Sequence, residues 1–170
     1  SANNNISRIR RIIKNLSRRY GSRLVWNGRE FFSFPESDAL ANASIDELID
    51  CGCGYRARYI KETAGMVYRG EIDLNGLKDV PYAQAHKELL ACPGVGPKVA
   101  DCILLFSCGK GEAFPVDVWI KRVMQHFYPG HSESSKDIRR FVEDRFGRLA
   151  GFAQQYLYYY ARDCLRLFDI

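Results

Sequence analysis

The sequence lacks several features that would each point to a particular class of protein. None of its apolar runs approaches the ~20 residues that a helix needs to cross a bilayer. The chain opens SANNNISRIRR, polar and then basic, which does not fit a secretory signal peptide. It contains no C-x-x-C pair and no His-x-x-x-His motif, which argues against a zinc site. Internal repeats, linkers and low-complexity stretches are absent as well.

Cysteine is present without forming a recognisable framework. The six cysteines are at positions 51, 53, 92, 102, 108 and 164, most of them among apolar residues, where a free thiol behaves as a small hydrophobe. This usage is typical of a reducing, intracellular setting. The three histidines, at 86, 126 and 131, are scattered and are interpreted as structural or surface residues.

The overall composition is that of a globular protein with a moderate positive charge. Hydrophobic residues make up 46% and charged residues 26% of the 170, and the formal net charge is +5. A positive balance fits a partner rich in phosphate, although charge alone does not identify one.

Hydrophobic periodicity predicts a mostly α-helical chain. Residues 5–20 have isoleucine and leucine at helical spacing, with arginines and Lys14 on the other face. The runs RLVW and REFFSF are joined by Asn27-Gly28, the strongest short hairpin signal. Further helices are expected over 44–52, 56–70, 81–94 with its end at Gly94, 97–109, roughly 135–145 and 152–167. The sequence therefore predicts one helical domain over residues 1–170, with one small β-hairpin near its N-terminus.

The stretch HKELLACPGVGPKVADCILLF reads as a helix, a tight turn and a second helix, a helix-hairpin-helix at about 82–108. Gly94, Val95 and Gly96 form the turn, in which glycine allows positive φ and backbone amides can bind a phosphate oxygen. An ordinary helix connection is the alternative. Lys98 falls in the first helical turn, where the helix dipole disfavours an ammonium and favours the nucleophilic amine. Asp117 precedes VWIKRVMQHF as a helix cap and could also face a cleft.

Together these blocks resemble a known family. ACPGVGPKVADCILLF followed by AFPVDVWIKRV resembles the signature of the helix-hairpin-helix, Gly/Pro…Asp base-excision glycosylases. SANNNISRI, GYRARYI, FPVDV and FAQQYLYY are similar, in the same order, to blocks of the 8-oxoguanine DNA glycosylase/AP lyase family. Four matched blocks are more specific than one motif.

The resemblance implies a role for each matched residue. Lys98 would attack the sugar and form an imine that leads to β-elimination, and Asp117 would stabilise the positive sugar. The base pocket would contain Cys102, Gln154 and Tyr158, although a plain core role stays open for some tyrosines of 156–160. The contacts with the orphaned cytosine and the duplex would come from Asn3, Arg8, Tyr55 and Arg56. Gly94, Val95 and Gly96 would hold the DNA backbone.

The match has departures and competitors. Trp119 stands where eukaryotic-type members have histidine, and Tyr158 stands where phenylalanine is expected. The N-terminal β-rich region usual in the family is expected to be absent from this chain. An endonuclease III-like lyase is one alternative, but those enzymes end in four closely spaced cysteines and this stretch has only Cys164. A helix-hairpin-helix module that only binds DNA is the other.

The implied chemistry also sets expectations for partners and cofactors. The partner would be double-stranded DNA containing oxidised guanine, with no membrane and with a monomeric protein. No organic cofactor or metal is required, although a monovalent cation can sit at hairpins of this type. The expected location is intracellular.

Overall fold

The computed structural model describes residues 4–131 and 134–164. In this part of the chain, helices dominate and the strands form a two-stranded sheet, which confirms the predicted fold class. No helix among these residues has both the length and the apolar character needed to cross a membrane. The chain divides into two compact units, Ser1–Leu74 with Cys92–Gly94 and Asn75–Ala91 with Val95–Ile170. The prediction of a single domain over 1–170 stays a prediction.

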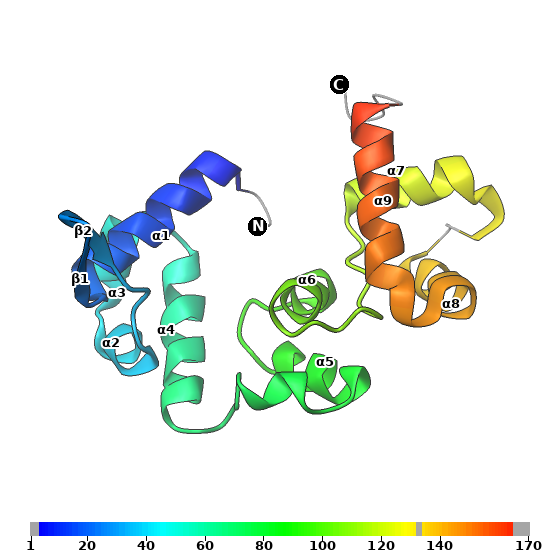
Figure 1. Ribbon diagram of the computed structural model, residues 1–170. Coiled ribbons are helices and arrows are strands. Elements are labelled where there is room, and N and C mark those ends of the chain that lie inside the picture. The colour runs from blue at the N-terminus through cyan, green and yellow to red at the C-terminus, as the bar shows by residue number, and fades with distance from the viewer. Residues whose placement is uncertain (1–3, 132–133, 165–170) are drawn as a thin grey trace. The chain divides into compact units, whose positions relative to one another are not determined.

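Apart from one short helix that the sequence did not predict, Ser37–Asn42, the elements of the first unit follow the predicted ranges closely (Figure 1). They are α1 (Ile6–Tyr20), β1 (Arg23–Trp26), β2 (Arg29–Phe32), α2 (Ser37–Asn42), α3 (Ile45–Asp50) and α4 (Arg56–Tyr68). Asn5 caps α1, since its side chain accepts a hydrogen bond from the backbone N–H of Arg8 at 2.8 Å. Ser44 and Glu47 form a capping box at the start of α3.

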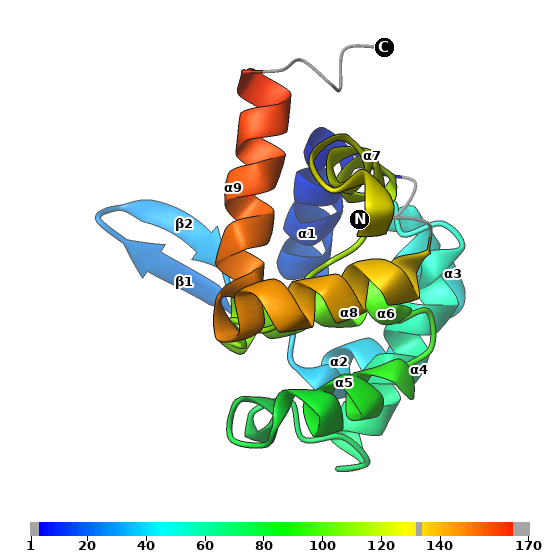
Figure 2. The same cartoon turned by 90° about the vertical axis from the view of Figure 1, so that its right-hand side faces the viewer.

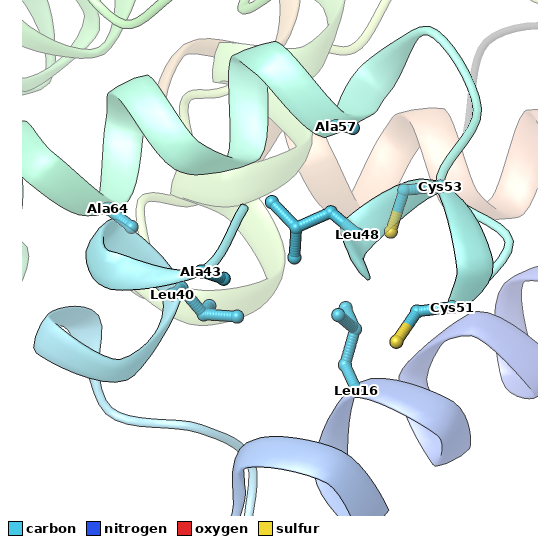
Figure 3. Packing of buried hydrophobic residues seen from close by; sticks show 8 residues of the cluster. All are labelled: Leu16, Leu40, Ala43, Leu48, Cys51, Cys53, Ala57 and Ala64. Atoms are coloured by element: carbon cyan, nitrogen blue, oxygen red, sulfur yellow. The ribbon is translucent and has the colours of Figure 1, made fainter. Parts of the chain in front are cut away.

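The core of this unit is built from small and aliphatic side chains. Figure 3 shows Leu48 of α3 pointing into the space between α1 and α4, with Leu16 below it and Ala57 above. Leu48 is fully buried, so its removal would leave a cavity. Cys51 and Cys53 are free thiols buried in the same cluster, as expected for cysteine used as a small hydrophobe.

The predicted hairpin is present and its turn has the expected geometry. Asn27 and Gly28 have φ of 48° and 70°, as a type I′ turn requires. Trp26 pairs with Arg29, and Arg23 pairs with Phe32 at the other end of the ladder. Figure 2 shows the hairpin projecting away from α1 and α2, and most of its residues are exposed.

The second unit is built almost entirely from helices that pack on one another. Its elements are η1 (Gly76–Lys78), α5 (Tyr82–Leu90), α6 (Pro97–Ser107), α7 (Val118–Phe127), η2 (Pro129–His131), α8 (Ser135–Phe146), η3 (Gly147–Leu149) and α9 (Ala150–Asp163). α5 packs on α6, and α7, α8 and α9 enclose a second apolar cluster that includes Phe114, Ile120 and Ile138. Figure 2 shows α8 running crosswise into the lower end of α9.

The last helix differs from its prediction in its first residue. α9 begins at Ala150, two residues earlier than expected, and residues 165–170 lie outside the described part of the chain. A core role is wrong for Tyr156, Tyr159 and Tyr160, because all three are exposed. Tyr158 packs against the apolar cluster of α7–α9, so a core role holds for this tyrosine.

Candidate functional site

The turn between α5 and α6 uses its two glycines differently. Gly94 has φ of 75°, and a Cβ there would lie 2.5 Å from the Tyr59 ring, so both backbone conformation and space require glycine. Gly96 is the N-cap of α6 with φ of −92°, and a Cβ would meet nothing. Positive φ is therefore needed at Gly94 and not at Gly96. Pro97 then takes the first helical position, as predicted.

Lys98 lies in the first turn of α6, half-buried, and Cys102 follows one turn later on the same helix. Burial raises the pKa of the Cys102 thiol, and the charge and the hydrogen-bonding capacity of Lys98 oppose the rise. The carboxylates of Asp101 and Asp117 act on the same thiol electrostatically and raise its pKa. The Cys102 thiol therefore lies within electrostatic range of the Lys98 amine and of the carboxylate that caps the next helix.

Asp117 is the N-cap of α7, as the sequence predicts. Its Oδ1 accepts hydrogen bonds from the backbone N–H of Trp119 at 3.0 Å and of Ile120 at 2.9 Å. Both bonds use the same oxygen, so the other oxygen keeps its capacity to face a developing positive charge. Trp119, which follows in the first turn, carries the guanidinium of Arg122 over its ring at 4.8 Å.

Gln154 and Tyr158 lie one turn apart on α9. Gln154 is buried, and its Oε1 accepts a hydrogen bond from the side chain of Gln155. The N-terminal end of α9 is held by the Gly151 N–H, which donates to the carbonyl of Gly111 at 2.7 Å. A Cβ at Gly151 would lie 2.2 Å from Leu105 of α6, so the first turn of α9 approaches the helix that carries Lys98 closely at this point.

A second charged cluster in this unit was not found from the sequence. Asp101 is fully buried on α6, and its Oδ1 accepts from the Tyr82 hydroxyl at 2.6 Å. Its Oδ2 accepts from the guanidinium of Arg139 on α8 at 2.8 Å, and His86 Nε2 lies 3.5 Å from Oδ1. Burial raises the pKa of Asp101 against the opposing effects of these three partners. The sequence signal for this cluster is the single acidic residue, Asp101, within the apolar helical stretch VADCILLF.

The expected duplex contacts of the first unit gather where α1 and α4 begin. Tyr55 is 61% exposed, with the guanidinium of Arg56 4.3 Å from its ring centre and Tyr59 edge-on to it at 6.4 Å. A Cβ at Gly54 would lie 3.8 Å from Nη2 of Arg8. The unit thus presents an exposed aromatic ring flanked by cations. Asn3 lies outside the described residues.

The predicted residues of the second unit lie on three helices. Lys98 and Asp117 both act electrostatically on the Cys102 thiol, and Gln154 and Tyr158 lie on α9, which approaches α6 at Gly151. No group of His, Cys, Asp and Glu within residues 4–131 and 134–164 has the arrangement of a metal site. What this geometry offers chemically is a potential nucleophile, a nearby negative charge and a buried amide.

Comparison with known proteins gives a consistent picture. Residues 1–148 match the model of the HhH-GPD superfamily of base excision DNA repair proteins. A probable N-glycosylase/DNA lyase of Methanothermobacter thermautotrophicus is 37% identical over 95% of this chain and 58% of its own length. The N-glycosylase/DNA lyase OGG1 of Arabidopsis thaliana is 35% identical over 93% of this chain and 46% of its own length.

Solved structures agree with these sequence relatives. The 8-oxoguanine glycosylase/lyase of Clostridium acetobutylicum, crystallised with double-stranded DNA containing cytosine opposite 8-oxoguanine, is 44% identical with a TM-score of 0.87. That match covers 95% of this chain and 56% of the other. The chain thus spans about half the length of the relatives that it matches.

Proposed function

Because the chain belongs to the HhH-GPD superfamily of base excision DNA repair proteins, we propose that it is the catalytic region of an 8-oxoguanine DNA glycosylase and AP lyase. The observation that carries the proposal is the placement of the half-buried Lys98 in the first turn of α6, with Asp117 oriented by backbone N–H groups as the N-cap of α7. A module that only binds DNA has no need for this combination. The substrate is duplex DNA with 8-oxoguanine opposite cytosine.

In the proposed reaction the neutral amine of Lys98 attacks C1′ of the damaged nucleotide. The bond from C1′ to the base nitrogen breaks, and the base leaves with a proton as free 8-oxoguanine. Opening of the sugar ring leaves an imine between Nζ and C1′. Loss of a proton from C2′ then breaks the bond from C3′ to its oxygen and cuts the strand on the 3′ side.

Asp117 assists the step in which the sugar carries most positive charge. A carboxylate fixed beside the oxocarbenium-like carbon stabilises that charge without reorganising. The two backbone N–H groups that hold Oδ1 give it a fixed orientation. The cap of α7 is thus also a positioned catalytic group.

Recognition requires the base to leave the duplex. Gln154 reads the edge of the extruded base, and Tyr158 and Cys102 take its two faces. In the first unit Tyr55 occupies the place that the base leaves, and Arg8 and Arg56, with Asn3, satisfy the orphaned cytosine.

The remaining parts of the proposal concern the DNA backbone and the setting of the reaction. The turn of Gly94, Val95 and Gly96 holds the DNA backbone through its amides. A monovalent cation bound at this turn would face the same phosphate. The chemistry needs no organic cofactor, and one copy of the chain is sufficient for it. A DNA substrate places the reaction inside the cell.

The test is borohydride trapping on duplexes that carry either one 8-oxoguanine opposite cytosine or one abasic site. We expect a covalent adduct on both, because borohydride reduces the imine to a stable amine. Lys98→Gln should abolish both adducts, since glutamine cannot form an imine.

Lys121→Gln is the matched control, because Lys121 is an exposed lysine of α7 outside the proposed site and its loss changes the charge equally. An adduct on the abasic duplex alone would contradict base excision by this chain and would support its lyase activity only. If a folded chain that binds DNA gave no adduct on either duplex, the result would contradict the proposed chemistry and support a module that only binds DNA.

A further inference from the structure

The positive charge of the chain is concentrated on one helix. α1 has the sequence ISRIRRIIKNLSRRY, with six of the 25 Lys and Arg residues and none of the 20 Asp and Glu residues. All other segments together therefore have 19 basic and 20 acidic side chains, one more acid than base. Such a distribution is the electrostatic footprint of a surface that meets phosphate.

Helix geometry gathers four of these cations on one side. At about 100° per residue, the positions 10, 11, 14 and 18 fall within an arc of roughly 100°. These four side chains are exposed and form what we call the basic stripe: Arg10, Arg11, Lys14 and Arg18. Ile12 and Leu16, which pack into the core, lie on the far side of α1.

The stripe is not neutralised by the protein. Within the described part of the chain, none of its four cations forms an ion pair, whereas Arg19 on the flank of α1 pairs with Glu47 at 2.9 Å. Glu30 of β2 lines the same shallow groove as Lys14 and Arg18. This carboxylate is already paired with Arg23 across the hairpin. Four like charges this close repel one another, so the surface favours an anionic partner.

We propose that the basic stripe is an additional, sequence-independent contact for the phosphate backbone of duplex DNA. The inference rests on the proposed function and extends its DNA contact along α1. The rise of a helix places Arg10 and Arg18 about 12 Å apart, the axial length of three to four nucleotides at about 3.4 Å each. The basic stripe is continuous with Arg8, which lies at the start of the same helix beside Gly54. Because Arg8 is a proposed contact with the duplex, this continuity favours DNA over an acidic protein as the partner.

The test measures how binding of an undamaged duplex depends on salt. The variant is Arg10→Gln/Arg11→Gln/Lys14→Gln, in which glutamine keeps the helix propensity and Arg18 stays beside the hairpin. Each phosphate that is no longer neutralised should make the plot of log K against log salt shallower by about 0.9, so we expect a change of roughly two to three. Circular dichroism and the unfolding midpoint verify that the variant is folded.

The matched control is Lys121→Gln/Lys136→Gln/Arg140→Gln, three exposed cations of α7 and α8 with the same loss of net charge. A larger change of slope for the stripe variant than for the control supports the proposal. Equal slopes for the two variants, or an unchanged slope for the stripe variant, overturn it and favour an acidic protein partner for the stripe. Trapping by the wild-type chain is scored separately, so failure of the proposed chemistry is distinguishable from failure of this surface.

Discussion

Asp101 and Asp117 lie in the same unit, and the protein surrounds their carboxylates in opposite ways. Asp101 is buried between three helices and interacts through both oxygens with Tyr82, Arg139 and His86. Asp117 is half-buried at the start of α7 and uses one oxygen to accept two backbone N–H groups. Both influence Cys102, and hence the surroundings of Lys98.

This difference indicates a structural role for one carboxylate and a chemical role for the other. Burying a carboxylate costs several kcal/mol unless protein donors hydrogen-bond to its oxygens. Oxygens that are engaged in this way are not available to a substrate. A half-buried carboxylate on a helix cap is oriented at little cost and keeps an oxygen available. We infer that Asp101 holds α5, α6 and α8 together and that Asp117 is the acid available to DNA.

The sharpest test replaces Asp117 with asparagine. Asparagine is as good an N-cap as aspartate, so the free energy of unfolding should be almost unchanged. Removing the charge that we propose faces the sugar should slow base excision by about 10²- to 10³-fold. Single-turnover excision of 8-oxoguanine at saturating protein measures the rate, and urea unfolding measures the stability.

Asp101→Ala is the reciprocal variant. It leaves the Tyr82 hydroxyl and the Arg139 guanidinium without their acceptor, so we expect a loss of roughly 3 kcal/mol in unfolding free energy. Excision by the folded fraction should fall far less than in Asp117→Asn. If Asp117→Asn lost stability and Asp101→Ala lost only activity, the two assignments would be exchanged.

The same contrast holds for the two glycines of the turn. Gly94→Ala places a side chain at positive φ and against the Tyr59 ring, and should cost about 1–2 kcal/mol. Gly96→Ala should be near neutral, because its φ of −92° and the open space around it accept a methyl group. Thermal unfolding of the two variants compares them directly.

A Tyr59→Ala background separates the two causes at Gly94. With the ring removed, Gly94→Ala should lose its steric cost and keep the cost of positive φ. An equal destabilisation by Gly94→Ala in both backgrounds would mean that the ring moves aside freely. The unfolding midpoint of the double variant decides between them.

Local signals in the sequence were sufficient for much of this structure. The period of α1, the Asn27-Gly28 turn and the cap at Asp117 each depend on residues within a few positions of one another. The position of Lys98 in the first turn of α6 is predictable for the same reason, because it directly follows a proline at the start of a helix. Short-range chemistry determines these features, so the sequence alone is enough to find them.

Other features depend on contacts that no local pattern contains. Asp101 meets Arg139 across 38 residues of chain, and only the fold brings them together. α2 is six residues long and its N-cap Glu36 makes no side-chain capping bond, so neither periodicity nor a cap revealed it. The exposure of Tyr156 likewise depends on how α9 packs, because a helix rich in tyrosine has no distinct apolar face.

The smallest expected effect concerns Glu47, an exposed carboxylate that completes the comparison. The backbone N–H of Ser44, the Arg19 guanidinium and the Ser44 hydroxyl, in decreasing order, lower the pKa of Glu47 from 4.5 to about 2. A folded-state pKa below the unfolded value stabilises the protein above about pH 4.5, and this contribution disappears as the pH falls towards 2. Glu47→Gln should therefore reduce the loss of stability between pH 4.5 and 2, as measured by urea unfolding across that range.

Arg19→Gln tests which partner causes this dependence. The Ser44 N–H is the larger cause, so removing the guanidinium should weaken the pH dependence only in part. Glutamine at position 47 can still accept from the Ser44 N–H, which keeps the capping box and limits the change to the charge. If Arg19→Gln removed the whole effect, the ion pair between α1 and α3 would be its source. Glu47 would then resemble Asp101, whose role depends on a distant partner, and not Asp117, whose role depends on its own helix.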